Sequence, residues 1–319
     1  MSGEWRQPGS SMSTLPNSPY SSFAGSPLHG VLLVLCAGLL WGTTGTAQSF
    51  SLGLSPYWVG ALRLLAAALF FLVYASWRLG PARLRRELAN LQWRQAIWAG
   101  ACMAGYNLTF FAGVKITGVA VGTALALGSG PIWAGLLQMT AGTRPSAGWW
   151  LGTLLAVAGG VLLVIGRGGA VRADPLGIAL CLAAGLTYAV YALLNKQLVR
   201  HSAPAVTTLG VFFVGAVLAL PAAGLQAGPP HITGTGWLVV GFLGVAATGV
   251  AYLLFTTGLR SISAASGVSL ALMEPVTAFV LAIVVVGEQP GSAAYAGLAA
   301  LLAGLAIVIR AETHGAPRP

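Results

Sequence analysis

Charged side chains are scarce in this sequence. Of its 319 residues, only 7% are Asp, Glu, Lys or Arg, whereas 56% are hydrophobic. A soluble domain carries roughly 25% charged residues, so this chain lacks the polar side chains needed to cover a water-exposed surface. The composition argues against an ordinary soluble protein and indicates one that is embedded in lipid.

The residue types that perform acid–base and metal chemistry are also few. The chain has six acidic residues, four histidines and three cysteines. The histidines fall at the ends of apolar runs or in links and tails, and the cysteines lie inside apolar runs, without metal-ligand or disulfide spacing. No glycine-rich Walker loop for ATP is present. We therefore expect no catalytic residue, metal or cofactor, and a membrane enzyme is the weakest alternative.

Apolar runs recur along the chain from residue 28 onward. About 20 helical residues cross a hydrocarbon core of roughly 30 Å, and ten runs of about this length can be drawn. Because the runs are continuously apolar, whereas barrel strands alternate, helices are favoured. We predict an all-α membrane protein with ten transmembrane helices. Their approximate limits are 28–51, 56–77, 93–113, 117–141, 147–166, 175–195, 203–225, 235–259, 262–287 and 291–309.

The net charge of +10 predicts the orientation of these helices. Five arginines crowd the link between the second and third runs, and basic residues favour the cytoplasmic side. If this link is cytoplasmic, so are both termini and twelve of the sixteen basic residues. The cluster also attracts anionic lipid, and we favour the lipid bilayer over nucleic acid as its partner. These arginines are Arg78, Arg83, Arg85, Arg86 and Arg94.

The two ends of the chain have a different composition. Residues 1–27 are rich in Ser, Pro and Gly, a composition that cannot bury a core, and we predict a disordered cytoplasmic tail. A long polar leader before a full-length apolar run is not typical of a secretory signal. Residues 311–319 are expected to form a second cytoplasmic tail.

The chain contains an internal duplication. Related residues recur at nearly constant spacing in two stretches, 28–166 and 175–310. Each stretch contains five predicted helices, an odd number, so the second must enter the membrane from the opposite side, as an inverted repeat. The matched pairs are Trp41 with Tyr188, Phe110 with Phe255, Gly113 with Gly258, Lys115 with Arg260 and Pro131 with Pro275.

Three motifs resemble the drug/metabolite transporter superfamily, in its EamA-like branch. They are "AGLLWG" from Ala37, "GALRLLAAAL" around Arg63 and "LRSISAASGVSLALMEPVTAFVLAIVVVGEQP" from Leu259. The resemblance covers roughly residues 28–310 and implies two five-helix domains in a carrier of the bacterial inner membrane, which mostly exports amino acids, metabolites or drugs. The first half departs from the family pattern, because Arg144 stands where the second half has Glu288.

Glu274 and Pro275 stand side by side within the ninth predicted helix, near the bilayer centre. A charged side chain at that depth costs roughly 2.5 to 3.5 kcal/mol, so Glu274 should face the bundle interior. Pro275 should free the carbonyl of Ala271, and Pro131 with its flanking glycines marks a matching helix break in the first half. Three roles stay open for Glu274: a structural hydrogen bond, contact with an amine of the substrate, and carriage of a coupling proton.

Other polar and aromatic groups at mid-depth are candidates for the wall of a substrate cavity, because lipid cannot satisfy them. For each of them, helix packing is an equal alternative to substrate contact. Arg63, close to the outer surface, is expected to pair inside the bundle, to bind substrate or to extend outward. The remaining candidates are Trp41, Tyr106, Asn107, Tyr188, Tyr191, Asn195 and Tyr252.

These features predict a secondary transporter, most simply an exporter, that moves a small metabolite, amino acid or drug by alternating access. A passive channel or a scaffold without transport activity is the main alternative, since similar helices would serve either. Inverted repeats with paired helix breaks favour alternating access over a fixed pore. The cargo, the coupling ion and the oligomeric state are not specified by the sequence.

Overall fold

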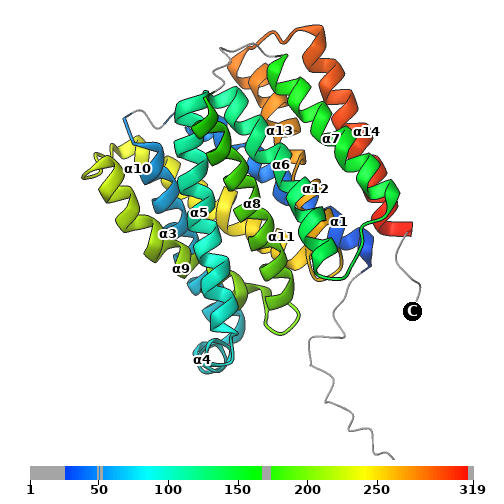
Figure 1. The fold of residues 1–319 in the computed structure, drawn as a ribbon. Helices are drawn as coiled ribbons and strands as arrows, with labels where there is room; N and C mark the ends of the chain where they lie inside the picture. The colour runs from blue at the N-terminus through cyan, green and yellow to red at the C-terminus, as the bar shows by residue number, and fades with distance from the viewer. Residues whose placement is uncertain (1–25, 49, 51–52, 167–173, 315–319) are drawn as a thin grey trace, which may run out of the picture.

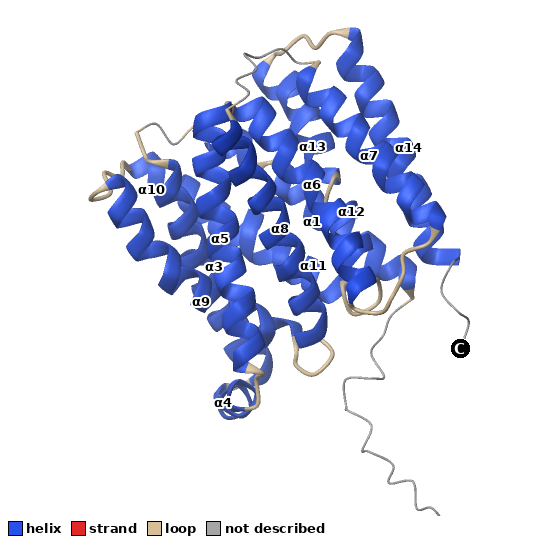
Figure 2. Cartoon of the chain, in the orientation of Figure 1, coloured by secondary structure: helices blue, strands red, loops and turns tan. Residues whose placement is uncertain are grey.

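The computed structural model describes residues 26–48, 50, 53–166 and 174–314. Most of the predicted tails, residues 1–25 and 315–319, therefore lies outside the described residues, as do Arg167 and Arg172. Every regular element in the described part of the chain is a helix (Figures 1 and 2). The all-α prediction is thus confirmed.

The helices follow the predicted apolar runs closely. In the first half they are α1 (Pro27–Gly42), α2 (Thr44–Gln48), α3 (Pro56–Leu79), α4 (Pro81–Ala89), α5 (Trp93–Thr117), α6 (Val119–Thr140) and α7 (Ala147–Ile165). In the second half they are α8 (Pro175–Leu198), α9 (Pro204–Ala227), α10 (Gly234–Phe242), the π-helical η2 (Leu243–Val250), α11 (Ala251–Gly258), α12 (Ala264–Leu270), α13 (Met273–Leu281), the π-helical η3 (Ala282–Val286) and α14 (Ser292–His314).

Nine helical stretches of the described residues are long and apolar enough to cross a membrane. Two of them combine several elements, namely Gly234–Gly258 and Ala264–Val286. The predicted run at 117–141 corresponds to α6, a helix of 22 residues that is not among the nine. Outward-facing apolar side chains agree with a lipid environment, since Val73 is 70% exposed and Leu151 is 63% exposed.

Several helices begin where a polar residue is followed by proline. At the start of α8, the Asp174 carboxylate accepts hydrogen bonds from the backbone N–H groups of Leu176 (2.9 Å) and Gly177 (3.1 Å), and Pro175 occupies the first helical position. Such a cap satisfies backbone donors that the first turn leaves unpaired. At the other end of the chain, α14 continues to His314, so the predicted tail from residue 311 begins as helix.

The helix α4 was not predicted from the sequence. It begins after Gly80, whose φ of 75° allows the chain to turn sharply. Its axis lies across those of the long helices, at the bottom of the bundle in Figure 1. Its arginines Arg83, Arg85 and Arg86 are exposed, and Leu84 is buried. The predicted arginine-rich link is therefore a short helix with an apolar and a basic face.

Glycines bring α7 and α14 into backbone contact. A Cβ atom added at Gly152 would lie 2.8 Å from the carbonyl oxygen of Gly304, and one added at Gly304 would lie 2.5 Å from the carbonyl oxygen of Gly152. Gly159 and Gly297 face each other's backbones in the same way. Small residues permit such close helix approach in membranes. We call this contact the glycine seam.

The two prolines that were expected to break helices behave differently. At Ala271 and Leu272 the helix is interrupted between α12 and α13, and Pro275 lies in the first turn of α13. By contrast, α6 continues through Pro131, so the break predicted there is absent. A membrane helix tolerates one missing N–H when its neighbours compensate, and Pro131 is buried among such neighbours.

Candidate functional site

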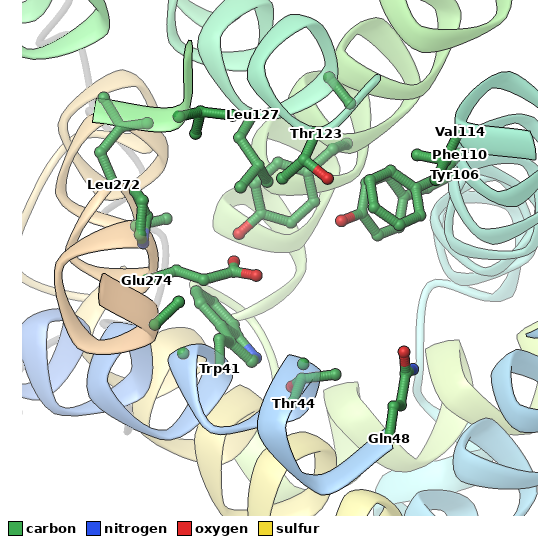
Figure 3. Close-up of a pocket in the computed structure, with 18 of the residues that line it drawn as sticks. Trp41, Thr44, Gln48, Tyr106, Phe110, Val114, Thr123, Leu127, Leu272 and Glu274 are labelled. Carbon is green, nitrogen blue, oxygen red and sulfur yellow. The ribbon is translucent and has the colours of Figure 1, made fainter. Parts of the chain in front are cut away.

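A cavity of about 600 Å³ is lined by residues from both duplicated stretches. A volume of this size suits a small molecule. Its wall is built by α1, α2, α3, α5, α6 and α7 from the first half and by α8, α11, α12 and α13 from the second. Figure 3 shows how side chains of α1, α2, α5, α6 and α13 converge on one space.

Glu274 contributes a carboxylate to this cavity. The interruption at residues 271 and 272 places it in the first turn of α13, and its side chain points into the cavity in Figure 3. The backbone N–H of Glu274 donates to the carbonyl of Ala271 at 2.9 Å. The carbonyl that Pro275 was expected to free is therefore occupied, because the chain closes a tight turn at this point.

Aromatic side chains form the wall beside Glu274. The rings of Trp41 and Tyr252 lie 4.9 Å apart, and those of Tyr106 and Tyr188 lie 5.4 Å apart. Trp41 also meets Tyr188 edge-on at 6.4 Å, so that the four rings are connected. All four line the cavity. Tyrosine and tryptophan offer both an apolar face and a polar group, and such faces attract a cationic nitrogen.

Arg63 reaches the cavity from α3 and is held in place by Asn107. One guanidinium nitrogen, Nη2, donates to Asn107 Oδ1 at 2.8 Å, and Asn107 Nδ2 donates to the carbonyl of Met103 at 2.9 Å. Asn107 is 3% exposed and does not line the cavity. The structure thus gives Asn107 a supporting position behind Arg63. Arg63 and Glu274 line the same cavity, and no salt bridge joins these two described residues.

Two other candidates lie outside the cavity wall. Tyr191 and Asn195 are fully buried between helices. Asn195 Nδ2 donates to the hydroxyl of Tyr191 at 3.1 Å and to that of Thr256 on α11 at 2.9 Å. These contacts tie α8 to α11. Tyr188, Tyr191 and Asn195 follow one another at helical spacing along α8, and only Tyr188 of the three lines the cavity.

Several lining residues were not identified from the sequence. Gln48 at the end of α2 and Thr123 on α6 add polar groups, and Figure 3 shows both side chains directed at the cavity. Glu288, which follows η3, lies at the edge of the same cavity. Gln48 carried a detectable signal, since an amide is unusual in an apolar run. The apolar residues Phe110, Leu127 and Leu272 could not be identified, because apolar residues that face a cavity and those that face lipid have the same sequence pattern.

The arrangement suits binding better than bond chemistry. The carboxylate of Glu274 lies beside a connected aromatic wall, a second carboxylate, that of Glu288, also lines the cavity, and Arg63 on α3 adds a guanidinium group. This combination matches a small molecule that has both a polar or charged group and an apolar part. Together with nine apolar helical stretches among the described residues, it defines a multi-pass membrane protein with a cavity large enough for a small molecule.

Comparison with known proteins gives the family. The model of the EamA-like transporter family matches twice, at residues 28–165 and 175–310. The uncharacterized transporter YwfM of Bacillus subtilis is 37% identical over 87% of this chain and 92% of its own length. The threonine/homoserine exporter RhtA of Escherichia coli is 27% identical over 89% of this chain and 92% of its own length.

A solved crystal structure has the same fold. It aligns with a TM-score of 0.76 at 22% identity, over 87% of this chain and 95% of that chain. The chain described here therefore belongs to the EamA-like transporter family, and it is a multi-pass membrane transporter. The resemblance to the drug/metabolite transporter superfamily is confirmed by these matches.

Proposed function

We propose that this protein is a secondary transporter of ten membrane helices that exports a small metabolite, amino acid or drug across the bacterial inner membrane by alternating access. In this proposal the stretches 28–166 and 175–310 are inverted five-helix repeats, α6 is the tenth span, and both termini are cytoplasmic. The observation that carries the proposal is the cavity wall formed by Glu274 and four aromatic rings at the contact of the two halves.

The packing of the helices supports the duplication. In the first half, α5 and α6 pack against α8 of the second half. In the same way, α11 and α13 of the second half pack against α1 of the first. The contact of α5 with α9 is mirrored by that of η2 with α3, and two further contacts join equivalent helices, namely α3 with α9 and α7 with α14. This is the pattern expected when two copies of one unit are related by a pseudo-twofold axis in the membrane plane.

Close glycine contacts repeat between the halves at matching positions. A Cβ atom at Gly113 would lie 3.1 Å from the carbonyl oxygen of Gly177, and one at Gly258 would lie 2.8 Å from that of Gly30. Gly113 corresponds to Gly258 in the sequence alignment of the halves. Gly30 and Gly177 are separated by the same 147 positions as Trp41 and Tyr188. These pairs support an origin of both halves from one unit.

The cavity opens outward in the proposed topology. Gln48, Pro56 and Glu288, which line it, lie next to links that positive-inside orientation assigns to the outer face. The opposite face carries α4 and the N-terminal end of α12. Export is supported by the relative named as a threonine/homoserine exporter, and a bacterial inner membrane by the bacterial origin of the relatives.

Reconstitution in proteoliposomes tests the proposed role of the cavity. Candidate amino acids, nucleosides and cationic drugs are first screened by thermal shift, because a bound ligand stabilises the folded form. Flux of the ligands found is then compared for the unmodified protein and Glu274→Gln, with Glu87→Gln on α4 as a control. We expect Glu274→Gln to abolish flux at unchanged folding and Glu87→Gln to retain it.

Undiminished flux in Glu274→Gln would remove this carboxylate from the transport mechanism. Counterflow separates a carrier from a passive channel. An alternating-access carrier exchanges labelled cargo on one side of the membrane for unlabelled cargo on the other, even when the total cargo concentrations are equal. Its flux also saturates as the cargo concentration rises. Flux that rises linearly and shows no counterflow would favour the channel.

A further inference from the structure

The first turn of α12 is held by side chains from two other helices. Glu312 on α14 accepts the backbone N–H of Ser263 through Oε1 at 2.8 Å. Its second oxygen, Oε2, accepts the hydroxyl groups of Ser263, at 3.2 Å, and of Ser266. Gln138 on α6 accepts the backbone N–H of Ala265 at 3.2 Å. We call Glu312, Gln138, Ser263 and Ser266 the α12 cap.

A second contact at the same end of the bundle holds the link between α11 and α12. The ammonium group of Lys196 on α8 donates to the carbonyl oxygens of Leu259 and Arg260, just beyond the end of α11. The link between α11 and α12 is therefore fixed on both sides, by Lys196 before it and by Glu312 after it. Hydrogen bonds that involve a charged group are the stronger ones.

The helix α12 separates this cap from the cavity. Ser266 is fully buried at the first turn of α12, whereas Val268 and then Ala271 and Leu272 line the cavity. The interruption at 271 and 272 follows directly, and Glu274 stands immediately after it. A helix of seven residues, fixed at one end and interrupted at the other, thus lies between the cavity and the cap.

The equivalent end of α6, at the opposite face, begins with a glycine in place of a serine. α6 begins after Gly118, whose φ is 87°. Because glycine has no side chain, Gly118 cannot cap the helix as Ser263 caps α12. In the alignment of the two halves, Gly118 corresponds to Ser263. The face where α6 begins is the one toward which the cavity opens, and the face where α12 begins is the closed one.

We propose that Glu312 is a gating residue: its hydrogen bonds to Ser263 and Ser266 hold α12 in place and keep the cytoplasmic side of the carrier closed while the cavity faces outward. The inference rests on the proposed alternating-access function. When the carrier turns inward, the α12 cap opens and α12 moves about the interruption at 271 and 272. Glu312 acts through α12 and does not contact cargo.

Accessibility of the cavity floor tests this role without any cargo. The full-length protein, with its three native cysteines replaced, carries Val268→Cys in membrane vesicles of known orientation. Labelling by a membrane-impermeant maleimide is measured from each side for the reference protein, for Glu312→Ala and for Glu87→Ala. We expect Glu312→Ala to raise the labelling rate from the cytoplasmic side about tenfold, which corresponds to roughly 1.4 kcal/mol, and Glu87→Ala to leave it unchanged.

Hydrogen exchange of residues 261–270 gives a second readout, in which Glu312→Ala should lose amide protection. If Glu312→Ala does not fold, Ser266→Ala keeps the carboxylate, removes one donor and should raise cytoplasmic labelling to a smaller extent. Folded variants whose labelling and exchange equal those of the reference would overturn the proposal. Because neither measurement needs transport, absence of flux would count against the proposed function alone.

Discussion

Asn195 illustrates how a polar side chain inside a membrane bundle can serve packing. Its amide bridges Tyr191 on the same helix and Thr256 on α11, and it is fully buried. Asn107 has a comparable supporting position, because it orients Arg63 at the cavity edge. Trp41, Tyr106, Tyr188 and Tyr252 instead meet one another on the cavity wall. Tyrosine occurs in both settings, because Tyr191 is buried between helices whereas the other three tyrosines named here face the cavity.

Replacement of Asn195 by Ala should lower stability without altering cargo affinity. Two hydrogen bonds are lost, each worth about 0.6 kcal/mol on average in membrane proteins, and the residue does not line the cavity. Thermal unfolding should therefore shift downward, while the KM of flux stays the same. Gln197→Ala, at an exposed position of the same helix, is the control. A changed KM for Asn195→Ala at full stability would contradict this assignment.

At the scale of the elements, the glycine seam between α7 and α14 makes a sharp prediction. A Cβ atom at Gly152 would lie 2.8 Å from both the carbonyl oxygen of Gly304 and the backbone nitrogen of Val308, neither of which can move aside. Gly152→Ala should therefore destabilise the protein by about 1 to 3 kcal/mol, as overpacking does. Thermal unfolding in detergent measures the difference.

Gly148→Ala in the same helix is a matched control for this prediction. The nearest atom to its added Cβ, the Cβ of Ala311, is 3.8 Å away, an ordinary contact. Alanine is also the better helix former, so Gly148→Ala should be neutral or slightly stabilising. Equal stability of the two variants would contradict the close backbone contact between α7 and α14 at Gly152.

The sequence predicted most helices to within a few residues, for identifiable reasons. Length and apolarity mark a membrane helix, and capping residues such as Asp174 with Pro175 mark its start. Other features depend on tertiary contacts. The π-helical turns of η2 and η3 leave no recognisable pattern, and the continuity of α6 through Pro131 depends on its neighbours.

The candidate site was partly predictable for a related reason. A carboxylate or a tyrosine is conspicuous in an apolar run, so Glu274 and the aromatic wall were found. Thr123 was less conspicuous, and cavity-facing apolar residues such as Phe110 and Leu127 look like lipid-facing ones. The depth of a residue can be read from its position in a run, whereas its direction depends on how the helices pack.

At the scale of the whole molecule, the proposed orientation predicts where the chain ends lie. Even numbers of spans return the chain to its starting side, and the arginines around α4 favour the cytoplasm. Reporter tags at the amino and carboxyl ends should both be accessible only from the cytoplasm in intact cells. A tag at the link between α13 and α14, near Glu288, should be accessible from outside. Ends on opposite sides would contradict the ten-span arrangement.

The glycine seam also constrains how the molecule can change shape. The backbones touch along Gly152, Gly159, Gly297 and Gly304, with no side chains between them that could repack, so we expect α7 and α14 to stay in contact when the molecule rearranges. Movement is then expected in the shorter helices, above all in α12. Glu312 holds the first turn of α12, and the helix is interrupted at residues 271 and 272. We therefore expect the two halves to stay joined where α7 meets α14, while most of the movement occurs in the seven residues of α12.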